Sequence, residues 1–219
     1  MANSGGQKYL LLIISLVSYL LFLFLWIGVS FHLSFITQID DTLIPLLQGG
    51  VTDSKTLFFT ILTQLGGTIA MILFSLITVI IVWRKLGVRL AIWAGATFFT
   101  GELLIPQIFK HITLRQRPDD PLIPISGYSF PSGHAAGSTT FYGFLAILLL
   151  LFYLKKKSSK VVVPILFALF ILLIMISRVY LSVHYPSDVI AGCLVGIGTI
   201  TLSAFIYEHG FFRLKNRRL

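Results

Sequence analysis

The sequence predicts an all-α fold, a six-helix transmembrane bundle with short extracytoplasmic interfacial helices. Hydrophobic residues make up 56% of the 219 residues and charged residues only 11%, and the mean hydropathy is +0.92. A membrane-spanning helix needs about 20 mostly apolar residues. The chain contains six such runs, at residues 9–30, 56–82, 89–109, 133–154, 161–178 and 187–207. Because these runs use most of the chain, we expect residues 1–219 to form a single integral-membrane domain.

The first apolar run could be either a cleaved leader or a retained span. It begins at Tyr9 directly after Lys8, an arrangement found in signal peptides. However, the run is longer than the apolar region of a usual signal peptide, and no small-x-small cleavage site follows it. We therefore expect it to remain as the first span.

The connection between the first two runs, residues 31–55, contains a short amphipathic segment. The apolar residues Leu43, Ile44, Leu46 and Leu47 lie behind Asp40 and Asp41. Aspartate is a favoured residue at the start of a helix, because its carboxylate accepts hydrogen bonds from free backbone N–H groups. We expect a short interfacial helix here, with the two aspartates supplying its cap.

Two spans contain pairs of glycines, and one contains a carboxylate. Gly66 and Gly67 in the second run, and Gly192 and Gly196 in the sixth, are suited to close helix packing. Glu102 lies in the third run, where an unpartnered carboxylate is costly. We expect it to pair with Lys110 or with a polar group of another span, and a role in headgroup selection is the alternative.

The distribution of lysine and arginine predicts the orientation of the chain. Of the 17 basic residues, 12 lie at the N-terminus, after the second and fourth runs, and in the C-terminal tail. The positive-inside rule places these ends in the cytoplasm, so both termini are expected to be cytoplasmic in the cell membrane. The other five are expected on the extracytoplasmic side, and they are Lys55, Lys110, Arg115, Arg117 and Arg178. We attribute the basic net charge to orientation and anionic headgroups, and we expect no nucleic-acid partner.

Three polar clusters fall on the extracytoplasmic side of this arrangement. They are Lys110 with six residues before Arg117-Pro118, then Pro131-Ser132-Gly133-His134, and then Ser177-Arg178 with five residues before His184 and three more before Asp188. Together they supply three cations, two imidazoles and one carboxylate. Lone Lys110 and Arg117 residues would be read as headgroup anchors, but their spacing to Pro118 argues for a site. We expect one active site at this end of the bundle.

The residue types in these clusters indicate phosphate chemistry. Three cations around one point require a multiply charged anion, and guanidinium groups match phosphate oxygens bidentately. Pro131 suits the first turn of a helix, so amides near Ser132 and Gly133 can face an anion, and Ser132 is expected to cap that helix as well. His184, oriented by Asp188, would attack phosphorus, and His134 would protonate the leaving oxygen and then activate water.

The order and spacing of the clusters resemble the type 2 phosphatidic acid phosphatase (PAP2) superfamily at every motif position. Within it, the chain looks most like the membrane-integral bacterial phosphatidylglycerophosphatase B and undecaprenyl-pyrophosphate phosphatase group. The resemblance implies hydrolysis through a phosphohistidine, with neither metal nor other cofactor. It implies catalytic roles for His184, His134 and Asp188, and phosphate binding by Lys110, Arg117, Ser132, Gly133 and Arg178.

The sequence leaves the substrate open. Phosphatidylglycerophosphate is a monoester and undecaprenyl pyrophosphate an anhydride, but both present a terminal phosphate on a lipid, and the motifs read only that phosphate. We place phosphatidylglycerophosphate ahead of undecaprenyl pyrophosphate. A non-catalytic carrier of anionic lipids would use the same cations, but it has no use for a histidine supported by Asp188 and faced by His134. With Cys193 as the one cysteine, a cysteine-rich metal site is excluded. No obligatory protein partner is inferred.

Overall fold

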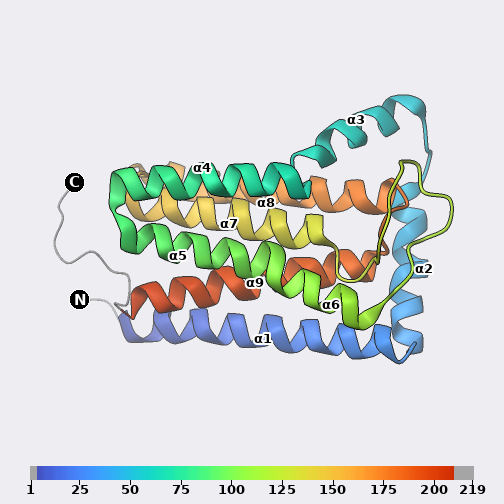
Figure 1. Ribbon diagram of the computed structural model, residues 1–219, viewed down its shortest axis with the longest axis horizontal. Coiled ribbons are helices and arrows are strands. Elements are labelled where there is room, and N and C mark those ends of the chain that lie inside the picture. Colours follow the sequence, from blue (N-terminus) through green and yellow to red (C-terminus); the bar gives the residue numbers. More distant parts are fainter. Residues whose placement is uncertain (1–3, 210–219) are drawn as a thin grey trace.

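The computed structural model describes residues 4–209, and it contains helices but no strand within that range. Most helices lie side by side along the long axis (Figure 1). In chain order they are α1 (Ser4–Ser30), α2 (Ser34–Gln48), α3 (Asp53–Gln64), α4 (Thr68–Leu86), α5 (Val88–Phe98), the π-helix η1 (Phe99–Leu104), α6 (Ile105–Thr113), α7 (Gly133–Phe152), α8 (Lys157–Tyr180) and α9 (Pro186–Glu208). The basic tail residues Arg213, Lys215, Arg217 and Arg218 lie outside the described residues.

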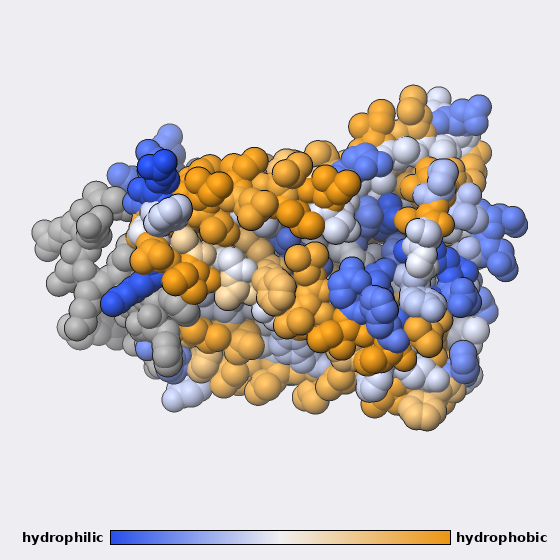
Figure 2. Space-filling model, viewed as in Figure 1, coloured by the Kyte–Doolittle hydropathy of each residue, from blue (hydrophilic) through white to orange (hydrophobic). Residues whose placement is uncertain are grey.

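The structure confirms the predicted six-span, all-α architecture. Six helical stretches are long and apolar enough to cross a membrane, and they are Tyr9–Ser30, Asp53–Leu86, Val88–Thr113, Gly133–Phe152, Lys157–Tyr180 and Pro186–Glu208. Hydrophobic side chains cover the length of the bundle, and hydrophilic ones gather at its two ends (Figure 2). This distribution is that of a multi-pass membrane protein.

One end of the bundle differs from the other. Helix α2 crosses this end roughly at right angles to the spans, α3 leans away from the bundle there, and residues 114–132 loop over it (Figure 1). We call it the α2 end. Helix α1 begins and α9 finishes at the opposite end. The polar clusters singled out in the sequence therefore meet at the α2 end.

The interfacial helix is longer than predicted, and its predicted aspartate cap is wrong. Helix α2 begins at Ser34, and its N-cap position, Leu33, makes no side-chain capping bond. Asp40 and Asp41 lie inside the helix instead. The apolar side of α2 begins earlier than residue 43, since Ile36 is buried against α1 and α9. Asp40 is also buried, because it has hydrogen-bond partners in the bundle.

The second and third spans are not uniform α-helices. The second span is interrupted between α3 and α4, where a side chain on Gly66 would come within 2.6 Å of Ser138 Oγ. The third span widens into the π-helix η1 around Glu102, whose carboxylate accepts a 2.8 Å hydrogen bond from Ser75 Oγ of α4. Its partner is thus a polar group of another span, and not Lys110.

Helix α9 packs closely against α7, as the two small residues in it predict. A Cβ atom on Gly192 would clash with the Ser132 carbonyl oxygen at the start of α7. A Cβ atom on Gly196 would lie 2.5 Å from Thr139 Cβ, one helical turn further on. Glycine at these two positions allows the backbones of the two helices to approach each other.

We predict that Gly192→Val destabilises the protein by about 1–3 kcal/mol, the usual cost of forcing extra atoms into a packed interior. The midpoint of thermal unfolding in detergent should fall accordingly. The control is Gly95→Ala in α5, because a Cβ atom there meets only Val79 Cγ2 at an ordinary 3.8 Å. An unchanged midpoint for Gly192→Val would contradict close packing of α9 on α7.

Candidate active site

Six of the eight site residues expected from the sequence, five of them with side chains and the sixth Gly133, line one cavity of about 430 Å³ at the α2 end. Lys110 comes from the last turn of α6, Arg117 from the following segment, His134 from the first turn of α7 and Arg178 from the last turn of α8. The fifth, His184, lies between α8 and α9. Residues more than 70 positions apart in the chain thus face one space.

The first of the three cations, Arg178, is almost completely buried. Its side chain is 1% exposed, its Nη1 donates a 2.6 Å hydrogen bond to Thr63 Oγ1, and its Nε has no partner among the described residues. Lys110 Nζ donates to the Tyr128 carbonyl oxygen at 2.7 Å. Within residues 4–209, neither side chain forms an ion pair. A buried charge without a counter-charge is costly, so this cavity is suited to an anion.

Arg117 organises the loop that closes the cavity. Its Nε donates to the Gly127 carbonyl oxygen at 2.9 Å, and its Nη2 donates to the Ser126 carbonyl oxygen at 3.1 Å. Its Nη1 donates to the Val183 carbonyl oxygen at 2.6 Å and lies 3.2 Å from Nε2 of His184. Arg117 therefore holds residues 126–127 over the site and places its charge beside the imidazole.

These contacts define the tautomer of His184. A guanidinium group can only donate hydrogen bonds, so Nε2 of His184 is the acceptor facing Arg117. The proton is then on Nδ1, which lies 3.4 Å from Oδ2 of Asp188. Nε2 thus carries the electron pair that a nucleophilic nitrogen needs, and in this structure that pair accepts from Arg117 Nη1.

The surroundings of His184 also favour its neutral form. The residue lies between two spans and its side chain is 2% exposed. Burial, followed by the positive charges of Arg178, Lys110 and Arg117, lowers the pKa of His184 well below its usual value. The imidazole is therefore neutral at pH 7, which is the state that a nucleophilic nitrogen requires.

Asp188 and Ser132 lie behind the cavity wall, fully buried. The amide of Ser132 donates to the Asp188 carbonyl oxygen at 2.9 Å, and its hydroxyl accepts from the Ala135 amide at 3.4 Å as the N-cap of α7. The Ser132 amide is thus unavailable to an anion, contrary to expectation. Gly133, the first residue of α7, does line the cavity, as its position at a helix start favours.

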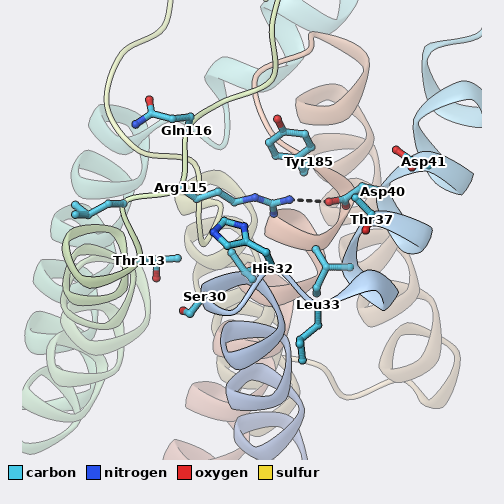
Figure 3. A pocket seen from close by; sticks show the side chains of 13 residues that line it. Ser30, His32, Leu33, Thr37, Asp40, Asp41, Thr113, Arg115, Gln116 and Tyr185 are labelled. Atoms are coloured by element: carbon cyan, nitrogen blue, oxygen red, sulfur yellow. Dashed lines mark hydrogen bonds and ion pairs between the residues drawn. The ribbon is translucent and has the colours of Figure 1, made fainter.

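Two further residues, Arg115 and Asp40, were not identified from the sequence, and they form an ion-pair network with Asp188 outside the cavity that contains His184. Arg115 Nη1 donates to Oδ1 of Asp188 at 2.6 Å, and its Nη2 donates to Oδ2 of Asp40 at 2.7 Å. Figure 3 shows Arg115 pointing towards Asp40 across a second cavity. The clue in the sequence is that Arg115 is one of the five basic residues on the predicted extracytoplasmic side.

The chain belongs to the PAP2 superfamily, whose family model matches residues 90–210, more than half of its length. It is 33% identical over 100 residues to phosphatidylglycerophosphatase B of Bacillus subtilis (strain 168), across 45% of this chain and 49% of that one. It is 31% identical over 134 residues to undecaprenyl-diphosphatase of Sulfolobus acidocaldarius, across 58% of each chain. These alignments span about half of the length of the two curated relatives.

The fold itself is matched over a longer stretch. The crystal structure of a transmembrane PAP2-type phosphatidylglycerolphosphate phosphatase from Bacillus subtilis superposes with a TM-score of 0.80 at 25% identity. The match covers 90% of this chain and 96% of that one. The resemblance inferred from the motifs is thus confirmed at the level of the superfamily and of the membrane fold.

Proposed function

We propose that this chain is a membrane-integral lipid phosphate phosphatase, acting as a single domain, that converts phosphatidylglycerophosphate to phosphatidylglycerol. One observation carries the proposal. In the described part of the chain, Lys110, Arg117 and Arg178 lack carboxylate partners and share a cavity with His184, which Asp188 supports. Cations without carboxylate partners, placed beside a neutral imidazole, form a site suited to phosphoryl transfer. Membership of the PAP2 superfamily supports the same activity.

In the first step, Nε2 of His184 attacks phosphorus while the bond between phosphorus and the lipid oxygen breaks. His134 gives its proton to that leaving oxygen, so the lipid departs as an alcohol. The imidazole of His184 then carries both the phosphoryl group and a positive charge. Asp188 stabilises that charge through Nδ1, as the third member of a catalytic triad does.

In the second step, water attacks the phosphorus of the phosphohistidine and passes a proton to His134. The bond between nitrogen and phosphorus breaks, inorganic phosphate leaves, and His184 returns to its neutral state. Throughout, Lys110, Arg117 and Arg178 bind the phosphoryl oxygens, because charge on those oxygens must be neutralised in both transition states. The amide of Gly133 adds a donor at the start of α7. Ser132, buried behind the cavity wall, contributes by capping α7, which holds the Gly133 amide in place.

The lipid chains of the substrate are proposed to remain in the bilayer while the headgroup enters from the side. The cavity, at about 430 Å³, suits a phosphorylated headgroup rather than a whole lipid. Its lining residues Thr68 of α4 and Gln107 of α6 are each followed by an exposed isoleucine, Ile69 and Ile108. Apolar side chains at this opening favour lateral entry between α4 and α6.

The runner-up substrate is undecaprenyl pyrophosphate, the cell-wall lipid carrier in its pyrophosphate form. The similarity to undecaprenyl-diphosphatase of Sulfolobus acidocaldarius favours it. Phosphatidylglycerophosphate is placed first because the structural relative that the chain matches over 96% of its length acts on that lipid by its description. Both lipids present a terminal phosphate to the same cations.

We predict that His184→Ala abolishes turnover and leaves the lipid bound, because it removes the nucleophile but none of the three cations. With terminally radiolabelled phosphatidylglycerophosphate, quenched wild-type protein should carry a base-stable label and His184→Ala should carry none. His209→Ala, at the opposite end of the bundle, is the control and should be labelled normally. A wild-type protein that binds the lipid without label or phosphate release would instead be a carrier of anionic lipids.

We predict that purified protein with chelator present releases phosphate at least tenfold faster from phosphatidylglycerophosphate than from undecaprenyl pyrophosphate. A tenfold preference corresponds to about 1.4 kcal/mol of differential transition-state binding. Both lipids should be compared as kcat/KM in one detergent and at one pH, with His184→Ala as the blank. The reverse preference would make the undecaprenyl lipid the substrate and leave the phosphatase assignment intact.

We predict that the α2 end, and with it the active site, faces the extracytoplasmic space. In a Cys193→Ala background, a membrane-impermeant thiol reagent should label Asp119→Cys in intact cells, because that loop residue is exposed. It should label Lys156→Cys, next to the start of α8, only after the membrane is opened. The opposite labelling pattern would place the site on the cytoplasmic leaflet.

A further inference from the structure

Arg115 connects the catalytic carboxylate to the interfacial helix. Its Nη1 donates to Oδ1 of Asp188 at 2.6 Å and to the hydroxyl of Ser187 at 2.8 Å. Its Nη2 donates to Oδ2 of Asp40 at 2.7 Å, and its guanidinium lies 4.1 Å above the ring of Tyr185. Arg115 is thereby held in one orientation by groups from α2 and from the start of α9.

Asp40 is held as firmly as the arginine it pairs with. Its side chain is 4% exposed, Oδ1 accepts from the Ser187 amide at 2.8 Å, and Oδ2 accepts from the Ser187 hydroxyl at 2.9 Å. Asp41, its neighbour in the same helix, is exposed. The sequence of α2 thus places one aspartate in the bundle and one in solvent.

Arg115 does not reach the phosphate site. It lines a separate cavity of about 480 Å³, drawn in Figure 3, which shares no lining residue with the cavity that contains His184. Arg117, two residues along, lines the phosphate cavity instead. Any effect of Arg115 on the reaction must therefore act through Asp188.

We propose that Arg115 and Asp40 are positioning residues that together set the orientation and the effective charge of Asp188. The proposal rests on the function proposed above. Arg115 holds Oδ1, which leaves Oδ2 for the Tyr185 amide at 3.0 Å and for Nδ1 of His184 at 3.4 Å. With that oxygen fixed, the imidazole has one orientation.

The second carboxylate in the network supplies the charge balance. Arg115 alone would neutralise Asp188 and weaken its attraction for the imidazolium that forms on His184. Asp40 offsets Arg115, so the set of Asp40, Arg115 and Asp188 retains one net negative charge. Although burial works against it, the charges of Asp188 and Asp40 raise the pKa of Arg115, so the arginine stays charged. The retained charge matches the single positive charge of the phosphorylated ring.

This arrangement predicts opposite pH effects for two substitutions in one ion pair. The charged and titratable groups that face His184 are Arg178, Lys110, Arg117, His134 and Asp188, and all stay unchanged. Arg115→Met removes a positive charge near His184 and raises its pKa, so the ratio of variant to wild-type kcat/KM should fall as the pH is lowered. Asp40→Asn removes a negative charge, so the same ratio should rise as the pH is lowered.

The experiment measures kcat and KM of wild type, Arg115→Met, Arg115→Lys, Asp40→Asn and Asp41→Asn on phosphatidylglycerophosphate across the pH range. We expect Asp40→Asn and Arg115→Met to lose roughly 10- to 100-fold in kcat, by analogy with the loss when a group that orients a metal-ligating side chain is removed, with little change in KM. Because all variants share one substrate, the ionisation of its phosphate cancels in each ratio. Arg115→Lys keeps the charge, so its ratio should not change with pH.

Asp41→Asn is the matched control, because it removes the same charge from the same helix at an exposed position. It should retain wild-type kcat and a pH-independent ratio. The proposal is overturned if wild type is active but Asp40→Asn and Arg115→Met have wild-type kcat. It is also overturned if the ratios of variant to wild-type kcat/KM for these two variants change in the same direction with pH. Wild type inactive on both lipids would refute the proposed function instead. If Arg115→Met does not fold, Arg115→Lys and Asp40→Asn decide, and wild-type kcat in both would refute the proposal.

Discussion

The site depends on a group of positive charges that are poorly solvated and have no carboxylate partners within residues 4–209. Arg178 is 1% exposed at the end of a membrane span, and no described residue accepts a hydrogen bond from its Nε. Such a charge is unfavourable in the free protein and becomes favourable when a multiply charged anion arrives. Burial, together with the same charges, lowers the pKa of His184 and keeps it neutral. Under the proposed function, one poorly solvated cluster of cations therefore supports both phosphate binding and the unprotonated form of the nucleophile.

Two arginines only two residues apart, Arg115 and Arg117, differ in whether a carboxylate pairs with them. Arg115 is matched by Asp40 and Asp188, while Arg117 is left with carbonyl oxygens and the imidazole. If a carboxylate were also shared with Arg117, the site would lose charge that the phosphate requires. Holding both aspartates on one side keeps negative charge behind His184 and positive charge in front of it, which is the polarity that attack on an anionic phosphoryl group needs.

The sequence predicts the spans and the motif residues well, because bilayer thickness fixes span length and each motif residue carries its own chemistry. It predicts other features poorly. The start of α2 depends on how the chain turns after α1, and the burial of Asp40 depends on Arg115, a residue 75 positions away. Arg115 and Arg117 lie in an irregular segment, where no periodicity tells which side each faces. The π-helix at Glu102 likewise depends on packing and on the Ser75 contact rather than on local propensity.

Membrane packing and catalytic geometry meet at the start of α7 and α9. The Ser132 amide donates to the Asp188 carbonyl oxygen, which joins the turn that carries His134 to the turn that carries Asp188. That bond requires the two helix starts to be nearly in contact, and Gly192 permits it, because any side chain there would strike the Ser132 carbonyl oxygen. A glycine that looks like an ordinary helix-packing residue is thus part of what sets the distance between His134, the proposed acid, and His184, the proposed nucleophile. Under the proposed function, the placement of these two histidines about one phosphorus atom depends on how closely α7 and α9 can approach each other.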